Sequence, residues 1–367
     1  MIRKEEIDKI IEGYDTSKIK IATICSHSAL QLFYGARQEG FETIGICEKK
    51  RKETYEAFPL GKPDKFIMVD NFKDILDEKY TELLRKQNAI MIPHGSFVEY
   101  VGPENLENKF LVPIFGNRKT LEWEGSREKQ KEWLGKAGLV LPKEFKNSSG
   151  INKKVFIKLS GAKGGKGFFT VSSKEELRKK LAERVNNGTI KKEDSNNITI
   201  QEFVSGVRYY IHYFYSPLYK NGTLAGEGRV ELLSMDKRIE PIDESYRGLP
   251  EIPQEFFDYT VTGNQPIVIR ESLLPELIKF GINVINTSIK LFPPGIIGPF
   301  CLETIYHPAR GFITFEISAR IVAGTNLYPQ GSQYSCYIFN EPMSTGRRIA
   351  REIKQGIIRG ELRKIIF

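Results

Sequence analysis

The first third of the chain alternates short apolar runs with amphipathic segments. The apolar runs cover residues 19–24, 43–47, 65–69 and 89–92, and the helical patterns cover residues 29–39 and 72–85. Such alternation is typical of a parallel sheet, in which each helix returns the chain to the start of the next strand. We therefore predict a parallel α/β domain over residues 1–122.

Two of the four histidines fall in loops that follow predicted strands of this domain. His27 lies between Ser26 and Ser28, and His94 comes two residues before Ser96. In parallel sheets ligands collect beyond the carboxyl ends of the strands, and hydroxyl groups there can bind phosphate. A lone loop histidine more often has no functional role, but two histidines at equivalent strand ends favour a ligand site.

A turn rich in glycine and lysine joins two apolar, strand-like runs in the middle of the chain. Residues 155–169 read VFIKLSGAKGGKGFF and include three lysines and four glycines. Glycines let backbone N–H groups surround an anion and lysines add charge, so this composition suits a triphosphate. The turn is not a Walker loop, because Lys166 is followed by glycine rather than by Ser or Thr. The alternative is a surface hairpin with solubilising lysines.

A second predicted hairpin carries a pair of glutamates. Apolar runs flank a Pro/Gly turn at residues 307–311, and a turn centred between residues 309 and 310 pairs Glu303 with Glu316. Opposed like charges about 5 Å apart are destabilising unless a cation lies between them. Mg²⁺ is commonly held by one or two carboxylates and substrate phosphates, so the pair is a candidate metal site. Arg320, on the same strand face as Glu316, is a candidate phosphate-binding group. The alternative is a pair of solvated glutamates on an exposed sheet.

The order of these features resembles the ATP-grasp superfamily, in which a lysine strand, a glycine-rich lid, an acidic hinge strand and a late pair of metal-binding acids follow one another. The hinge here is the segment Gln201-Glu202-Phe203-Val204-Ser205-Gly206. Further motifs resemble the formate-dependent 5-formaminoimidazole-4-carboxamide ribonucleotide (FAICAR) synthetase family of archaeal purine biosynthesis. They are SHS at 26–28, PHGSF at 93–97, FGNR at 115–118, TGN at 262–264, RESLLP at 270–275 and GPFCL at 298–302.

The resemblance covers nearly the whole chain and implies an ATP-grasp fold after the N-terminal domain. It implies a lid subdomain over residues 123–206 and a C-terminal subdomain with the metal site over residues 207–367. The implied nucleotide-binding residues are Arg127, Lys158, Gly161, Lys163, Gly164, Gly165, Gln201, Glu202, Phe203, Val204 and Glu240. The implied ligands of the substrate aminoimidazole carboxamide ribonucleotide (AICAR) are His27, Ser96 and Asn264, and the implied catalytic residues are Lys158 and Arg320.

Three positions leave alternatives open. Glu231 and Glu240 are both strand-borne candidates for the nucleotide pocket, and the resemblance favours Glu240. Ser318 stands where the superfamily commonly has a metal-binding asparagine. Arg127 stands where many members have a nucleotide-contacting lysine, and an arginine there keeps the charge.

Composition narrows the class of protein. The chain has 367 residues, and its 55 Lys and Arg against 46 Asp and Glu give a net charge of +9. No zinc-finger spacing and no one-sided basic helix is present, so we expect small anionic substrates and no nucleic-acid partner. Four cysteines without paired spacing and the lack of a long apolar stretch predict a cytoplasmic protein without membrane contact.

The resemblance implies a specific reaction and its cofactors. With Mg²⁺ or Mn²⁺ bound, ATP would phosphorylate formate, and the amine of AICAR would attack the resulting formyl phosphate. We expect a homo-oligomer. Two alternatives remain, namely an ATP-grasp ligase that joins a different small acid to an amine, and a non-catalytic nucleotide-binding paralogue. The second is less favoured, because the lysine, the lid glycines, the hinge acid and the paired acids are all retained.

Overall fold

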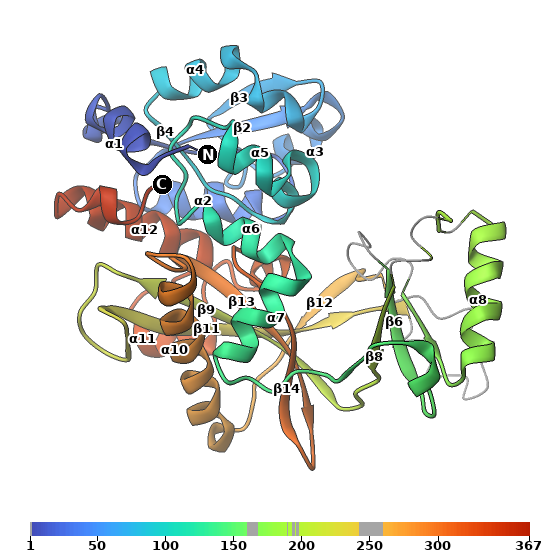
Figure 1. The fold of residues 1–367 in the computed structure, drawn as a ribbon. Helices are drawn as coiled ribbons and strands as arrows, with labels where there is room; N and C mark the ends of the chain where they lie inside the picture. The colour runs from blue at the N-terminus through green and yellow to red at the C-terminus, as the bar shows by residue number, and fades with distance from the viewer. Residues whose placement is uncertain (1, 160–167, 189, 193–194, 196–197, 242–259) are drawn as a thin grey trace.

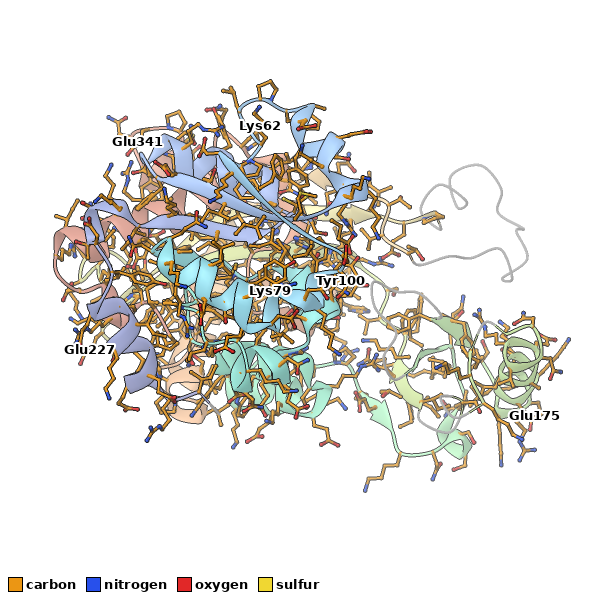
Figure 2. The ribbon with its side chains drawn as sticks, turned by 90° about the horizontal axis from the view of Figure 1, so that it is seen from above. Lys62, Lys79, Tyr100, Glu175, Glu227 and Glu341 are labelled. Atoms are coloured by element: carbon orange, nitrogen blue, oxygen red, sulfur yellow. The ribbon has the colours of Figure 1, made fainter. Side chains whose placement is uncertain are left out.

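The computed structural model describes residues 2–159, 168–188, 190–192, 195, 198–241 and 260–367, and the described strands form three sheets (Figure 1). A parallel sheet near the N-terminus and a larger antiparallel sheet make up the main body. A third, smaller sheet stands to one side with helix α8 (Lys174–Asn186). Figure 2 shows the same separation from above, with Glu175 of α8 far from Lys62 and Glu341.

The N-terminal sheet has the strand order β3-β2-β1-β4, and all its pairings are parallel. Its strands are β1 (Lys20–Ile24), β2 (Glu42–Glu48), β3 (Lys65–Val69) and β4 (Ala89–Met91), and its helices are α1 (Lys4–Glu12), α2 (Ala29–Gln38), α3 (Lys52–Glu56), α4 (Glu78–Lys86) and α5 (Pro103–Asn108). The predicted parallel α/β domain is confirmed. The helical pattern at residues 72–85 is divided, because Asn71 caps a short 3₁₀ helix at Phe72–Leu76 and α4 begins only after Asp77.

The central sheet is antiparallel, with the order β10-β11-β9-β13-β14 and with β12 added to β11. Its strands are β9 (Val207–Ser216), β10 (Leu224–Ala225), β11 (Gly228–Ile239), β12 (Gly263–Pro266), β13 (Gly298–His307) and β14 (Gly311–Ser318). Helices α7 (Arg127–Lys136) and α10 (Leu274–Leu291) share one apolar core with it. Trp133 of α7 is fully buried there and donates a hydrogen bond to the Val284 carbonyl at 2.8 Å.

The small sheet has the order β5-β8-β6-β7, with strands β5 (Glu144–Phe145), β6 (Val155–Leu159), β7 (Phe169–Val171) and β8 (Ile198–Glu202). Two helices, α6 (Lys119–Gly125) and α7, come before this sheet in the chain. They separate at Ser126, whose hydroxyl caps α7 by accepting from the Lys129 amide. The limits of the three predicted domains stay a prediction. Helix α7 belongs to the predicted lid subdomain in sequence, yet it packs with the central sheet.

Helix α12 (Thr345–Ile358) brings the end of the chain back to the N-terminal domain. It packs against α2, and Arg348, Ile349 and Glu352 are fully buried. The charged residues of α12 are typical of a surface helix, but one face of the helix is buried and several of these residues find partners inside the protein. The last residue also pairs with this domain, since the Phe367 amide donates to the Ile114 carbonyl at 2.8 Å.

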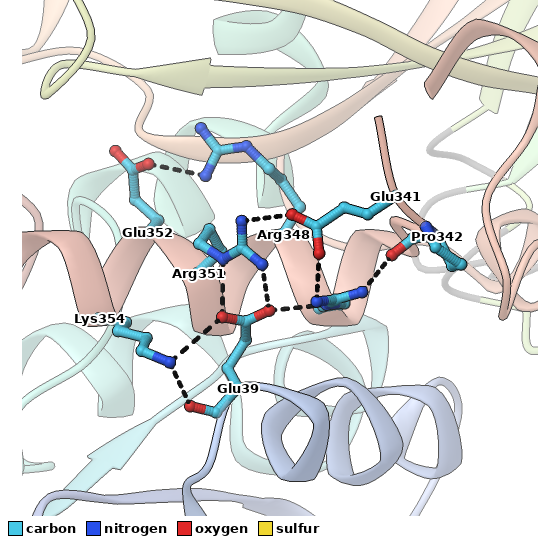
Figure 3. A network of polar contacts seen from close by, with 8 residues as sticks. Glu39, Glu341, Pro342, Arg348, Arg351, Glu352 and Lys354 are labelled. Atoms are coloured by element: carbon cyan, nitrogen blue, oxygen red, sulfur yellow. Dashed lines mark hydrogen bonds and ion pairs between the residues drawn. The ribbon is translucent and has the colours of Figure 1, made fainter. Parts of the chain in front are cut away.

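One buried carboxylate fastens α12 to the end of α2. Glu39 accepts hydrogen bonds from Arg347 Nε at 2.6 Å and from both Nε and Nη2 of Arg351 at 2.6 and 2.7 Å (Figure 3). Burial acts to raise the pKa of Glu39, but the hydrogen bonds from Arg351 and Arg347 outweigh it and lower the pKa. Lys354 donates to the Glu39 carbonyl at 3.1 Å. The cluster thus joins the first and last parts of the chain.

We expect Glu39→Gln to cost about 2 kcal/mol of unfolding free energy at neutral pH, as for hydrogen bonds to charged groups. Because the pKa of Glu39 is lower in the folded than in the unfolded chain, this stabilisation is complete above the unfolded value of about 4.3 and is lost as pH falls through the folded value. Urea unfolding should give equal differences from wild type at pH 7 and pH 6 and a shrinking difference below about pH 4. Glu12→Gln, which breaks the exposed pair with Arg363, is the control and should change little.

No helix in the described part of the chain is both long and apolar enough to cross a membrane. All four cysteines are free thiols, and three of them are buried. The cytoplasmic location and the oligomeric state stay predictions.

Candidate active site

The two predicted metal-binding glutamates lie opposite each other on β13 and β14. Glu303 pairs with Glu316, as the sequence predicts. Nearer the turn the predicted register is wrong. From Thr304 to His307, each residue pairs with the residue one position before its predicted partner. A β-bulge then leaves Phe315 without a partner and restores the expected pairing at Glu303. Bulges of this kind re-aim side chains beside functional sites.

Glu303 is buried and held in a fixed orientation by Arg238 of β11. The Arg238 Nη2 donates to Glu303 Oε1 at 2.7 Å, and its Nη1 donates to Oε2 at 3.1 Å. The guanidinium lies over the Tyr210 ring at 4.0 Å. Such a two-pronged contact fixes the plane of a carboxylate. Arg238 is missing from the predicted site, although strand alternation places it on the same face of β11 as the predicted Glu240.

Glu316 is an exposed residue whose carboxyl group nevertheless lies among charged protein groups. Desolvation and repulsion from Glu303 raise the pKa of Glu316 to about 7, while Lys158 of β6 acts to lower it. Desolvation lowers the pKa of Lys158 and of Arg127, and Glu316 opposes both shifts. Lys158 Nζ also lies 5.6 Å from the centre of the Phe315 ring. The structure thus gathers four predicted residues, Arg127, Lys158, Glu303 and Glu316, from four separate elements.

The two carboxylates and the two cationic side chains gathered here suit a divalent cation bound together with phosphate groups. Two opposed carboxylates repel each other here, and a cation between Glu303 and Glu316 would relieve the repulsion. No group of three or more His, Cys, Asp or Glu side chains suited to a metal occurs among the described residues. A pair of acids is nevertheless what Mg²⁺ needs when phosphates supply other ligands. Ser318, which stands at the usual asparagine position, donates to Glu303 Oε1 at 3.1 Å.

Arg320 lies between these charged residues and the N-terminal domain. Its Nη2 lies 3.1 Å from Glu124 Oε1 of α6, and Glu124 also accepts from the Ala319 amide at 2.9 Å. On the other side, a β-carbon added to Gly95 would lie 3.4 Å from Arg320 Cζ and 3.0 Å from His27 Nε2. A side chain at position 95 would therefore collide with His27. The predicted catalytic Arg320 and the predicted AICAR ligand His27 are thus neighbours.

His27 rests on His94, and their rings stack with centres 5.4 Å apart. His94 is buried and its Nε2 lies 3.0 Å from the Ile24 carbonyl oxygen. Burial lowers the pKa of His94 to about 3, so its ring is neutral. His27 is exposed and has a φ of +52°, which is uncommon outside glycine and is found at ligand sites. The buried His94 ring therefore supports the His27 ring by stacking against it, and His27 is the histidine that a ligand can reach.

Asn264 of β12 is oriented by a buried polar chain. Its Nδ2 donates to Asp236 Oδ2 at 2.7 Å, and Asp236 Oδ1 lies 2.7 Å from His212 Nε2. The other ring nitrogen of His212 lies 2.6 Å from Ser234 Oγ. Because the amide nitrogen donates to this carboxylate, the orientation of the Asn264 side chain is fixed, and its role as an AICAR ligand stays a prediction. His212 thus lies between Ser234 and Asp236 and supports Asn264 from the interior.

The two candidate glutamates of β11 have different surroundings. Glu231 is buried and accepts hydrogen bonds from Arg229 and Arg348, within the protein interior. Glu240 lies at the end of β11 and pairs with Arg208 at 2.5 Å. Glu231 is therefore a structural residue, and Glu240 stays the predicted nucleotide ligand.

The predicted hinge begins with the last two residues of β8, Gln201 and Glu202, which are buried. Glu202 accepts from Arg310 Nη1 at 2.8 Å, which ties the small sheet to the hairpin of the central sheet. Phe203 is 38% exposed and Val204 is half-buried. The predicted lid residues Gly161, Lys163, Gly164 and Gly165 lie outside the described residues. The nucleotide-binding roles of both segments stay predictions.

Comparison with known proteins places the chain in a family. A family model described as "Domain of unknown function (DUF1297)" matches residues 176–367, and one described as "Protein of unknown function (DUF1246)" matches residues 21–145. A 5-formaminoimidazole-4-carboxamide-1-(beta)-D-ribofuranosyl 5'-monophosphate synthetase of Korarchaeum cryptofilum is 52% identical, and one of Methanosarcina acetivorans is 48% identical. Each match covers 100% of this chain and 100% of the relative. The chain belongs to this synthetase family.

Solved structures confirm the ATP-grasp fold that the resemblance to the FAICAR synthetase family implies. An IMP biosynthesis protein PurP from Thermococcus kodakaraensis is 30% identical, with a TM-score of 0.74 over 95% of this chain and 100% of that chain. The ADP complex of purK, an N5-carboxyaminoimidazole ribonucleotide synthetase, is 12% identical, with a TM-score of 0.61 over 91% of this chain and 76% of that chain. The second likeness concerns the fold alone.

Proposed function

We propose that the protein is an ATP-dependent ligase that formylates AICAR to FAICAR and takes its one-carbon unit from formate. Membership of the FAICAR synthetase family over the full chain length supports the reaction. The choice of formate is the finer part of the proposal. It is supported by the phosphate-binding character of the site, because ATP is needed when a carboxylate must be activated before an amine can attack it.

The reaction has two steps that conserve every atom. A formate oxygen attacks the γ-phosphorus of ATP, the bond from that phosphorus to the oxygen it shares with the β-phosphate breaks, and formyl phosphate and ADP form. The AICAR amine then attacks the formyl carbon. The bond from that carbon to the oxygen it shares with phosphorus breaks, and phosphate leaves as the nitrogen loses a proton. A protein contributes to such chemistry mainly by positioning the reactants and stabilising charge.

The described residues divide these tasks. Lys158, Arg127 and Arg320 would stabilise the charge on the transferred phosphoryl group, and His27 and Asn264 would hold AICAR. Glu303 and Glu316 would hold Mg²⁺, which neutralises phosphate charge when it is bound. Desolvation and repulsion from Glu303 raise the pKa of Glu316, and this supports the assignment, because a cation held by both carboxylates would favour their charged forms.

The observation that carries the proposal is the proximity of Arg320 and His27 through Gly95. Arg320 follows the strand of Glu316, and His27 follows β1 of the parallel domain. An acyl phosphate formed beside Arg320 would therefore arise next to the acceptor amine. This arrangement suits transfer of a reactive intermediate without exposure to water.

The identity of the donor acid can be tested directly. With ATP, Mg²⁺ and AICAR supplied, ADP release should be fastest with formate and much slower with acetate, bicarbonate or amino acids. Oxygen-labelled formate should deliver label into the released phosphate, because the bridging oxygen stays with phosphorus. Unlabelled phosphate alongside normal FAICAR formation would reject carboxylate activation. Faster turnover with a larger acid would keep the mechanism and reassign the protein as an ATP-grasp ligase for that acid.

A further inference from the structure

Glu202 lies where the chain both enters and leaves the small sheet. The chain enters this sheet through residues 137–143, between α7 and β5, and leaves it through residues 203–206, between β8 and β9. The Glu202 amide donates to the Lys143 carbonyl at 2.7 Å, and its side-chain Oε2 accepts from the Lys143 amide at 3.2 Å. The entry and exit segments are therefore fastened to each other at Glu202.

The other carboxylate oxygen of Glu202 is bound by a residue of the central sheet. Arg310 lies in the turn between β13 and β14, and its Nη1 donates to Glu202 Oε1 at 2.8 Å. Burial acts to raise the pKa of Glu202, but the hydrogen bonds from Arg310 and Lys143 outweigh it and lower the pKa. The carboxylate is therefore charged at neutral pH, and Arg310 holds it with a charge-assisted hydrogen bond.

The same hairpin of β13 and β14 contacts both connecting segments (Figure 1). In the entry segment, the Val140 carbonyl accepts from the Thr314 amide of β14 at 2.8 Å. In the exit segment, Gly206 packs against the backbone of Tyr306, because a β-carbon added to Gly206 would lie 2.3 Å from the Tyr306 carbonyl oxygen. The small sheet thus rests on the hairpin that carries the paired glutamates.

The position of Lys158 depends on how the small sheet lies on this hairpin. Lys158 belongs to β6 of the small sheet, whereas Glu316, which acts on its pKa, belongs to β14. Glu202 pairs with Val155 of β6, three residues or about 10 Å along the strand from Lys158. A rotation of the small sheet about its two connecting segments would therefore move Lys158 away from Glu316, and the contact between Glu202 and Arg310 opposes such a rotation.

We infer that Arg310 is a positioning residue for phosphoryl transfer, because by binding Glu202 it keeps the small sheet in the orientation that places Lys158 beside Glu316. The inference rests on the proposed function for the reaction, but the anchoring contact does not. Without Arg310, only a fraction of the molecules would hold Lys158 in place. The apparent affinity for ATP falls by that fraction, and saturating ATP restores the competent orientation.

Kinetics of Arg310→Gln test this prediction. The KM for ATP should rise about 3- to 10-fold, between the values for buried and exposed ion pairs, since the Arg310 side chain is 33% exposed. The kcat and the KM for AICAR should stay within about twofold of wild type. Arg310→Lys should recover part of the ATP affinity, because it keeps the charge without the planar fork.

Lys153→Gln is the matched control. Lys153 Nζ lies 3.8 Å from the same Glu202 Oε1, but Lys153 belongs to the small sheet and its side chain is 59% exposed. Its loss removes a cation near Glu202 without cutting a link to the central sheet. The KM for ATP should therefore equal that of wild type.

A distance measurement reports the orientation of the small sheet without any turnover. Cys336 of α11 (Gln333–Ile338) is an exposed thiol on the main body, and Lys179→Cys places a second thiol on the exposed side of α8. Spin labels on these two thiols should give a broader distance distribution in ligand-free Arg310→Gln than in the wild-type background or in Lys153→Gln. ATP with Mg²⁺ should narrow the distribution of Arg310→Gln again.

The outcomes separate this inference from the proposed function. An unchanged KM for ATP in Arg310→Gln would overturn the inference, with or without a broader distance distribution, and would leave the proposed function standing. Equal changes in Lys153→Gln would also overturn it, because they would reflect charge near Glu202 and not a link between the sheets. If Arg310→Gln broadens the distribution and weakens ATP binding while wild type forms no FAICAR from ATP, formate and AICAR, the anchor is supported and the proposed function is rejected.

Discussion

Replacing Glu316 with glutamine is expected to lower kcat by about 10²- to 10³-fold, which is about 3 to 4 kcal/mol of transition-state stabilisation. The variant keeps the shape of the side chain and removes one of two opposed carboxylates. If the pair holds Mg²⁺ on ATP, the countercharge is lost while the strand is kept. Steady-state ADP release at saturating AICAR and formate measures the effect, and a magnesium titration should show a raised requirement for the metal.

Folding should not suffer in the same variant. Repulsion between Glu316 and Glu303 disappears, so the melting temperature without ligands should equal or exceed that of wild type. Glu132→Gln on α7 removes the same charge from an exposed pair with Lys136 and should leave turnover unchanged. Wild-type turnover by Glu316→Gln would disprove the metal assignment. A large loss of stability would mean instead that the carboxylate has a structural role.

Replacing Arg348 with methionine is expected to destabilise the protein by about 3 to 5 kcal/mol, the usual cost of removing one partner of a buried ion pair. Arg348 is fully buried and donates to Glu231 at 2.8 and 3.1 Å and to Glu352 at 2.7 Å. Its guanidinium also lies 4.1 Å from the centre of the Phe214 ring. Without it, two buried carboxylates face each other with less compensation. Urea unfolding at neutral pH measures the loss.

Two further variants show whether charge is the cause. Burial raises the pKa of Glu352, so removing its charge should recover part of the stability in an Arg348→Met, Glu352→Gln double variant. Arg178→Met on α8, which replaces an exposed arginine, is the control and should change the stability little. A loss as large at Arg178 as at Arg348 would contradict the proposed buried cluster.

The sequence by itself determined the local elements and the chemistry of their ends. Buried parallel strands show as continuous apolar runs, so β1 to β4 could be found, and the Pro/Gly turn at residues 307–311 put Glu303 and Glu316 on facing strands. The order of the lysine strand, the hinge and the paired acids indicated the ATP-grasp family, which the relatives confirm. These features depend on neighbours in the chain, and a linear pattern records them.

The tertiary structure decided what depends on distant segments. No local pattern could show that a bulge at Phe315 restores the glutamate register, or that Arg238 holds Glu303 from another strand. The charged pattern of α12 is typical of a surface helix, yet Glu39 and Glu231, which lie far away in sequence, supply partners for its arginines inside the protein. Buried charge is stable only where such partners meet, and folding alone brings them together.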